Sequence, residues 1–147
     1  MRRYATYHKT PAGTNLTILE VIGVTTTRGR IYEFGIGSDS APADIATEFE
    51  MIRGTVSGTG TALNENPLDG ADPVALLSAK GGTFATQTKT TNSSLWAKAI
   101  NQRASYRWVA VPDGELVIPA TADAWIGLES IASGGTPSIK AMIYWQE

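Results

Sequence analysis

The chain of 147 residues contains no cysteine, which excludes disulfide bonds, thiolate catalysis and cysteine-ligated metal centres. Its only histidine is His8, so a site with several histidine ligands is excluded as well. Charged residues make up 18% of the chain and the formal net charge is −2, which argues against direct nucleic-acid binding through excess positive charge. No apolar run approaches the roughly 18–20 residues that span a bilayer, and no apolar segment of a secretion signal follows the basic start. We therefore expect a protein made in the cytoplasm, without a membrane or nucleic acid as its direct partner.

Glycine and the residues that favour strands are abundant. The chain has 15 glycines and 7 prolines, and short stretches of alternating polar and apolar residues recur with turn residues between them. The length suits one domain with a substantial core. The pattern predicts an all-β protein, an antiparallel β-sandwich of about eight to ten strands. The expected strands cover residues 16–24, 31–36, 47–53, 95–102, 106–110, 114–120, 124–132 and 139–145, with a polar strand or loop at 81–90.

Two segments predict which side chains face the core. In 47–53, Phe49 and Met51 face one way, while Glu48, Glu50 and Ile52 face the other. In 139–145, the set Ile139, Ala141, Ile143 and Trp145 forms one face. The segments 95–102 and 106–110 follow each other closely, which favours a hairpin between them.

One short helix is predicted near the middle of the chain. Asp72 is a suitable N-cap, Pro73 suits the first helical position, and Gly81-Gly82 is a typical stop after Lys80. The apolar run 74–77 lies inside this segment. About two turns of helix are expected to close one end of the sandwich.

An N-terminal arm over residues 1–15 is predicted to precede a single sandwich domain over residues 16–147. The arm combines positive charge with aromatic rings, and arginine and tyrosine are enriched at interaction hot spots. The stretch 54–71 has the least periodicity, and long ordered loops in compact domains are often functional. The alternative for the arm is a frayed terminus. We expect these two segments to contribute the residues of an interface with a partner protein or with another subunit: Arg2, Arg3, Tyr4, Tyr7, His8, Lys9, Thr59, Asn64 and Asn66.

Charge alternates in blocks along the chain. Residues 1–30 carry a net +4, residues 31–72 a net −7, residues 73–112 a net +5 and residues 113–147 a net −4. Opposite blocks either lie side by side within one molecule or form complementary faces between subunits. The sequence alone leaves both interpretations open.

Candidate catalytic and ligand sites are weak, so we expect no catalytic residues, no cofactor and no metal. His8 lies in the predicted arm, which is a poor position for a catalytic base. Glu48 and Glu50 share a face, which is typical of a solvated strand. The acidic stretch 64–72 lacks the spacing of an EF-hand and favours a capped turn over a calcium site. The four tryptophans lie on predicted strands, where core or interface roles are more common than sugar stacking.

The order of several segments resembles small jelly-roll decoration (cement) proteins on the capsids of tailed bacteriophages. The resemblance covers most of the chain from Leu16 onward. The segments that carry it are residues 27–33, 37–38, 42–44, 49–55, 58–59, 101–110, 112–115 and 119–121, and the ending Tyr144-Trp145-Gln146-Glu147. The first fifteen residues match nothing in that pattern.

The resemblance implies a jelly-roll-like fold and a structural, non-enzymatic role. It implies a homotrimer on the outer surface of the phage head that binds and stabilises neighbouring subunits of the major capsid protein. The protein would then be made in the host cytoplasm and reside in the virion. A receptor- or glycan-binding module of the same fold is the alternative.

Overall fold

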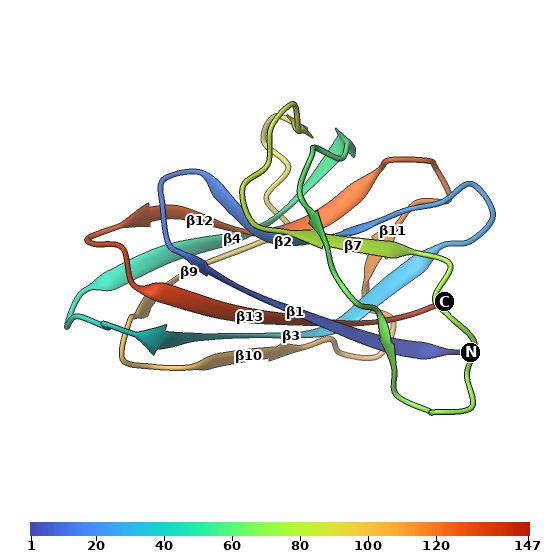
Figure 1. The fold of residues 1–147 in the computed structure, drawn as a ribbon, viewed down its shortest axis with the longest axis horizontal. Helices are drawn as coiled ribbons and strands as arrows, with labels where there is room; N and C mark the ends of the chain where they lie inside the picture. Colours follow the sequence, from blue (N-terminus) through green and yellow to red (C-terminus); the bar gives the residue numbers. More distant parts are fainter.

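The computed structural model describes residues 1–147 and contains only strands, turns and loops. Two antiparallel sheets face each other, and the two chain ends lie close together at one end of the molecule (Figure 1). The prediction of an all-β antiparallel sandwich is therefore confirmed. The strands are β1 (Arg3–Pro11), β2 (Leu16–Ile22), β3 (Gly29–Ser40), β4 (Ala46–Val56), β5 (Thr61–Ala62), β6 (Asn66–Pro67), β7 (Ser78–Gly81), β8 (Thr88–Lys89), β9 (Trp96–Asn101), β10 (Tyr106–Val109), β11 (Leu116–Ile118), β12 (Trp125–Ser133) and β13 (Ser138–Gln146).

Sheet A has the order β10-β3-β13-β1-β6, and β11 pairs with β3 beyond the end of β10. Sheet B has the order β5-β7-β2-β12-β4-β8, and β9 also pairs with β4. β6 thus lies at one edge of sheet A, and β10 and β11 lie at the opposite edge. This arrangement places segments that are distant in sequence at two separate edges of the same sheet.

The main core lies between the sheets and follows the predicted alternation. Phe49 and Met51 of β4 are buried in it, as is the whole predicted inner face of β13. A second, smaller cluster of Ile22, Ile52 and Trp125 is buried apart from this core. Since Ile22 follows the core residue Val21 along β2, this second cluster lies on the outer face of sheet B.

The predicted helix is wrong, because the structure contains no helix and therefore none that could cross a membrane. Residues 78–81 instead form β7, which pairs with β2 at the edge of sheet B. Leu77 and Ala79 are buried while Ser78 is exposed, which is the two-residue period of a strand. The backbone N–H groups of Leu76 and Leu77 donate to the Glu147 carboxylate, at 2.7 and 3.1 Å, instead of forming helical hydrogen bonds.

The predicted hairpin between 95–102 and 106–110 is also wrong. β9 pairs with β4 in sheet B, whereas β10 pairs with β3 in sheet A. The intervening turn crosses from one sheet to the other. Aromatic rings join the two strands across the core instead, with Trp96 and Tyr106 5.3 Å apart.

Residues 3–11, predicted as part of an N-terminal arm, form β1 within sheet A. Every residue of β1 has a partner on β13, from Arg3 opposite Gln146 to Pro11 opposite Ser138. The inward-facing positions of β1 are Tyr4, Thr6, His8 and Thr10; His8 is half-buried and the other three are buried. Two of these are threonines, so the alternation of this strand is weak in the sequence.

All five ion pairs join a basic block of the sequence to an acidic block within one molecule. Opposite charge blocks therefore do meet within one molecule, as the first of the two interpretations expects. The pairs are Lys9–Asp39, Arg30–Glu115, Lys89–Glu129, Arg103–Asp44 and Arg107–Glu33.

Candidate functional site

Three of the predicted N-terminal interface residues have structural roles on or beside β1. Tyr4 is fully buried, stacks on Trp145 at 5.8 Å and donates its hydroxyl proton to the Pro73 carbonyl oxygen at 3.0 Å. Burial raises the pKa of the Tyr4 phenol. The prediction of Tyr4 as an interface residue is therefore wrong. Arg2 exchanges two backbone hydrogen bonds with Glu147, and the Arg3 guanidinium lies 5.7 Å from the Tyr32 ring.

Five other predicted residues do come together around a hollow beside β1. Tyr7, His8 and Lys9 line it from the strand, and Asn64 and Asn66 line it from the opposite side, around a volume of about 540 Å³. The hollow exists because β6 pairs only with Tyr4 and Ala5, which leaves the rest of this edge of β1 uncovered. Thr59 lies elsewhere, with its backbone N–H donated to the Ala85 carbonyl oxygen.

The three β1 side chains that line this hollow already have partners within the chain. Lys9 pairs with Asp39, and Lys140 lies 4.9 Å from the centre of the Tyr7 ring. The His8 imidazole packs against Gly81, where a Cβ atom would overlap it. Partial burial lowers the pKa of His8, because the charged imidazolium loses hydration there.

The acidic and histidine residues do not form a cluster of the kind that holds a metal ion. No group of three or more His, Asp or Glu side chains is placed to hold a metal ion. In the stretch 64–72, Asp69 forms a turn by accepting the backbone N–H of Ala71 on its side chain at 3.0 Å. Glu50 lies opposite Glu129 of β12, while Glu48 lies opposite Ala132 and is exposed.

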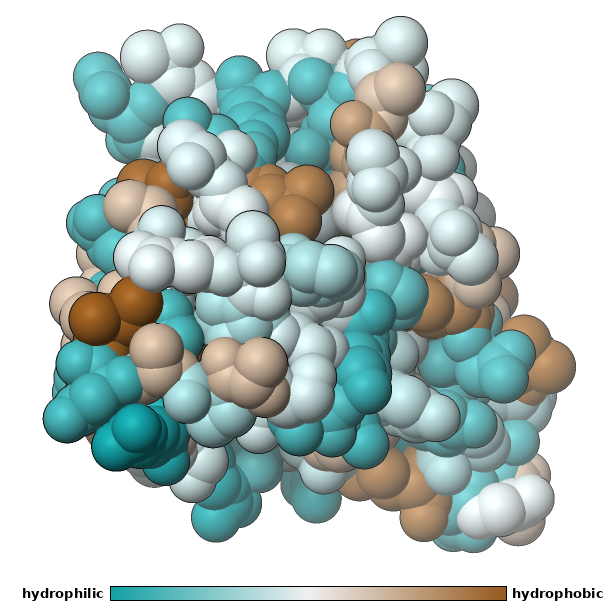
Figure 2. All heavy atoms as spheres, turned by 60° about the vertical axis from the view of Figure 1, so that its left-hand side comes forward, coloured by the Kyte–Doolittle hydropathy of each residue, from teal (hydrophilic) through white to brown (hydrophobic).

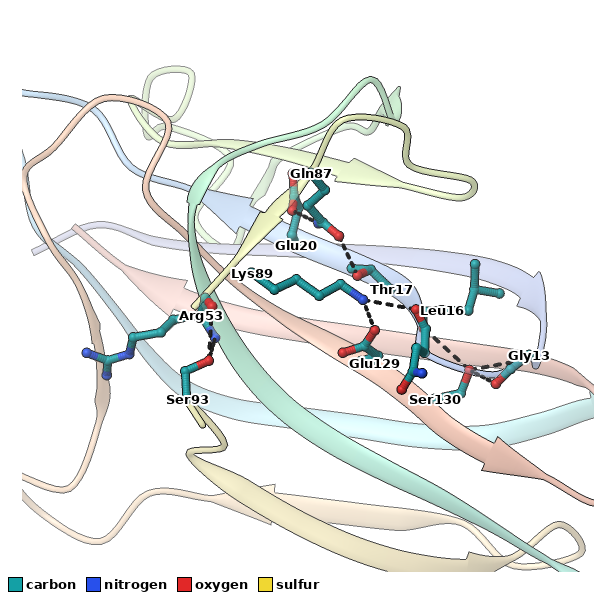
Figure 3. A network of polar contacts seen from close by, with 11 residues as sticks. Gly13, Leu16, Thr17, Glu20, Arg53, Gln87, Lys89, Ser93, Glu129 and Ser130 are labelled. Carbon is teal, nitrogen blue, oxygen red and sulfur yellow. Dashed lines mark hydrogen bonds and ion pairs between the residues drawn. The ribbon is translucent and has the colours of Figure 1, made fainter. Parts of the chain in front are cut away.

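Two buried carboxylates on the outer face of sheet B fix the loops that cover it (Figure 3). Glu20 is fully buried and accepts hydrogen bonds from the Ser57 hydroxyl at 2.6 Å and the Gln87 side-chain amide at 2.5 Å. Glu129 is 3% exposed and pairs with Lys89. These contacts hold the segments around residues 57 and 87–89 over the sheet. We assign the network a structural role because each carboxylate already has partners from the covering loops.

Burial raises the pKa of Glu20, and the hydrogen bonds from Ser57 and Gln87 offset only part of this effect. A raised pKa in the folded state means that protonation stabilises the fold. That stabilisation is fully present below the usual pKa of about 4.5 and is lost as the pH rises through the folded-state value. We compare the free energy of unfolding of the Glu20→Gln variant with that of the original chain. The original chain loses this stabilisation as the pH rises and the variant does not, so the value for the variant minus the value for the original chain is expected to increase above pH 4.5.

Denaturant unfolding across a pH series from 4 to 7 measures this difference, with Glu48→Gln as the reference for removing an exposed carboxylate. A difference that is constant with pH, or that decreases as the pH rises, contradicts the prediction.

An exposed apolar patch surrounds the chain ends. We call Met1, Leu68, Val74 and Leu76 the termini patch; these side chains are 90%, 52%, 79% and 51% exposed. Backbone contacts hold the segment in place, because Leu68 N–H donates to the Arg3 carbonyl at 2.9 Å and Glu147 binds the N–H groups of Leu76 and Leu77. Leu77 is buried. The chain therefore presents Val74 and Leu76 outward from a fixed backbone.

A second exposed apolar patch lies on the β10–β11 edge of sheet A. Val109 of β10, Val111 of the following turn and Val117 of β11 are 51%, 71% and 36% exposed, and we call them the valine patch. The turn is tied to β3 and to itself by hydrogen bonds from Ala110 N–H to the Tyr32 carbonyl and from Gly114 N–H to the Val111 carbonyl, both 2.8 Å. On the side drawn in Figure 2, apolar residues form small separate groups among hydrophilic ones.

No protein-family description, curated protein or solved structure matches this chain. Its function is therefore inferred from its own surfaces. The sequence predicted the residues around the β1 hollow, but it did not single out the two apolar patches. Exposed valine and leucine are common in any chain, and only the fold shows that these lie beside the chain ends and on the β10–β11 edge of sheet A.

Proposed function

We propose that the chain is a capsid decoration protein, a homotrimer that binds the outer surface of a phage head and stabilises contacts between major capsid protein subunits. The observation that carries the proposal is the pair of exposed apolar patches, one at the end of the sandwich beside the chain termini and one on the β10–β11 edge of sheet A. Two different patches on one molecule favour a head-to-tail contact, and such a contact closes into a ring when the rotation between subunits permits. The resemblance described above implies that the ring has three members.

The sandwich suits this role physically. Head-to-tail contact through the two patches would cover the β10 edge of sheet A, which otherwise leaves a strand edge open to unwanted pairing. Three linked copies also bind a repeating surface more strongly than one, because the second and third contacts form at high effective concentration. We place the protein in the virion on this basis, with its own copies and the major capsid protein as its partners.

Two complementary variants test the ring. A double change Val74→Asp/Leu76→Asp disables the termini patch, and Val111→Asp disables the valine patch. We expect the original chain to have three times its 15.6-kDa mass by size exclusion with light scattering, and each variant to be a monomer. An equimolar mixture of the two variants is expected to form dimers, because each contributes one intact patch, while Ala122→Asp on an exposed loop leaves the trimer intact.

If either variant forms a dimer on its own, its one intact patch must bind the same patch of a second copy, which contradicts head-to-tail contact.

Binding to phage heads that lack this chain is measured by co-sedimentation. We expect the trimer to bind at least about a hundredfold more tightly than either monomeric variant. A monomeric original chain, or a trimer that does not sediment with the heads, would reject the proposal.

A further inference from the structure

A groove of about 530 Å³ runs along β3 on the outer face of sheet A. Gly35 and Gly37 form its floor, because neither has a side chain at a position where the strand faces outward. On β13, Met142 lies opposite Gly35 and Lys140 lies opposite Gly37. On β10, Arg107 lies on the other side of Gly35. Glu33 and Asp39 mark the two ends of the groove along β3.

The fold itself does not require these two glycines. A Cβ atom at Gly35 would come no closer than 3.8 Å to any neighbour, here the Tyr106 carbonyl oxygen, and one at Gly37 would lie 3.8 Å from Ser105. Neither residue has a positive φ. By contrast, Cβ atoms at Gly54 or Gly81 would overlap their neighbours. Glycine within a strand weakens it and often marks a place where a ligand approaches the backbone. Because Gly35 and Gly37 have no side chains, the space above them stays open and forms the groove.

The groove walls combine apolar surface with fixed hydrogen-bonding groups of both signs. Tyr144 and Met142 provide the apolar part on β13. Glu33 is bound by Arg107, with 2.5 Å between Oε1 and Nε, and Asp39 is paired with Lys9 from β1. These pairs hold the polar groups in place before a ligand arrives, which reduces the entropy lost on binding.

The side chains that line the groove carry no net charge, and Lys9 of the neighbouring strand β1 pairs with Asp39 at one end. Two carboxylates, Glu33 and Asp39, and two cations, Arg107 and Lys140, line it. A balanced set of donors and acceptors beside an aromatic ring suits the hydroxyl groups and C–H faces of a sugar, and it gives no net attraction to phosphate or to a polyanion. The volume lies within the usual range of small-ligand sites.

We propose that this groove binds a neutral oligosaccharide. Sugar rings would lie over Gly35 and Gly37 against Tyr144, and their hydroxyl groups would bond to the Glu33–Arg107 pair at one end and the Asp39 carboxylate at the other. This inference is independent of the capsid role, because the groove lies on the outer face of sheet A and none of its lining residues belongs to either apolar patch. It is tested on the purified chain without phage heads.

The test is a titration of the isotope-labelled chain, followed through its amide NMR signals, with cellotriose, maltotriose, triacetylchitotriose and the anionic sialyllactose. We expect at least one neutral trisaccharide to shift the signals of Gly35 and Gly37, with a dissociation constant of about 1 mM or tighter. Sialyllactose is expected to bind at least about tenfold more weakly. Absence of these shifts with all three neutral sugars, or equal binding of sialyllactose, overturns the proposal.

A Gly35→Val variant separates binding from folding. Valine favours strands and meets no obstacle here, so the melting temperature is expected to stay equal or rise, while affinity falls at least about tenfold. Gly70→Val, in a turn with nothing within 4 Å, is the matched control and keeps the original affinity. If Gly35→Val does not fold, Tyr144→Ala provides the same comparison through loss of the ring. If Gly35→Val or Tyr144→Ala folds and binds the sugar with the original affinity, the proposal is overturned. It is also overturned if the Gly35 and Gly37 signals shift with protein concentration alone, without added sugar.

Discussion

A Gly54→Ala variant is expected to lose about 3 kcal/mol of unfolding free energy, a large effect for the addition of one methyl group. Gly54 of β4 lies opposite Trp125 of β12. A Cβ atom at this position would overlap both the Thr88 carbonyl oxygen and the Trp125 indole. The first of these is backbone of β8, which cannot rotate away, so the strand pairing between β4 and β8 has to open.

The same change would disturb a second set of contacts. Trp125 is fully buried, forms the small outer cluster of sheet B with Ile22 and Ile52, and donates its indole N–H to the Val56 carbonyl at 3.0 Å. Displacement of the indole breaks this hydrogen bond and exposes the cluster. Denaturant unfolding measures the effect, and Gly70→Ala, with nothing within 4 Å, is the control. Equal stability of the two variants would contradict the geometry described for Gly54.

A Trp145→Ala variant is expected to lose about 4 kcal/mol of unfolding free energy. Trp145 is fully buried on the inner face of β13, and its ring stacks on Tyr4 of β1 at 5.8 Å. Removal of the ring leaves a cavity in the main core beneath the neighbouring strands β13 and β1 of sheet A. The cavity also removes the packing surface of Tyr4, whose hydroxyl holds Pro73 beside the termini patch.

Trp145→Phe provides the matched comparison. The Trp145 Nε1 atom is buried without a hydrogen-bond partner, so phenylalanine keeps an aromatic ring while it removes an unsatisfied donor. We expect a loss below about 1.5 kcal/mol for this variant. Thermal and denaturant unfolding of both variants measures how much of the stability comes from the volume of the ring. A similar loss of unfolding free energy in the two variants would show that ring volume is not the main contribution of Trp145 to stability.

The sequence predicted best those strands in which apolar side chains alternate with polar ones. β4 and β13 were predicted with their correct inner faces, since Phe49, Met51, Ile143 and Trp145 all lie in the main core. β1 was missed because buried Thr6 and Thr10 look polar in the sequence, although each is covered by the opposite sheet. Composition alone does not show that a threonine faces inward.

The errors elsewhere arose where local signals compete with long-range pairing. Asp72, Pro73 and Gly81-Gly82 are good helix signals, but a two-turn helix has little stability of its own, and pairing of 78–81 with β2 buries Ala79 instead. The supposed hairpin failed for a similar reason, because its two strands find their partners in different sheets. A local pattern does not specify which distant strand will pair.

The candidate surfaces depend on the same long-range arrangement. Gly35 and Gly37 stand out in the sequence as two glycines at alternate positions of a strand. That they face outward into an open groove follows only from their neighbours on β10 and β13. The two apolar patches likewise become apparent only once the fold places Leu76 beside Glu147 at the chain ends and β10 and β11 at the edge of sheet A.

The backbone pairing of Arg2 with Glu147 has a practical consequence for handling the protein. An affinity tag or fluorescent fusion at either terminus emerges beside Val74 and Leu76 and would shield the surface proposed for self-association. The turn at Gly134-Gly135, between β12 and β13, lies at the other end of the sandwich (Figure 1). A circular permutant opened at that turn, with the present ends joined by a short linker, moves both attachment points away from the contact surface and keeps every strand intact.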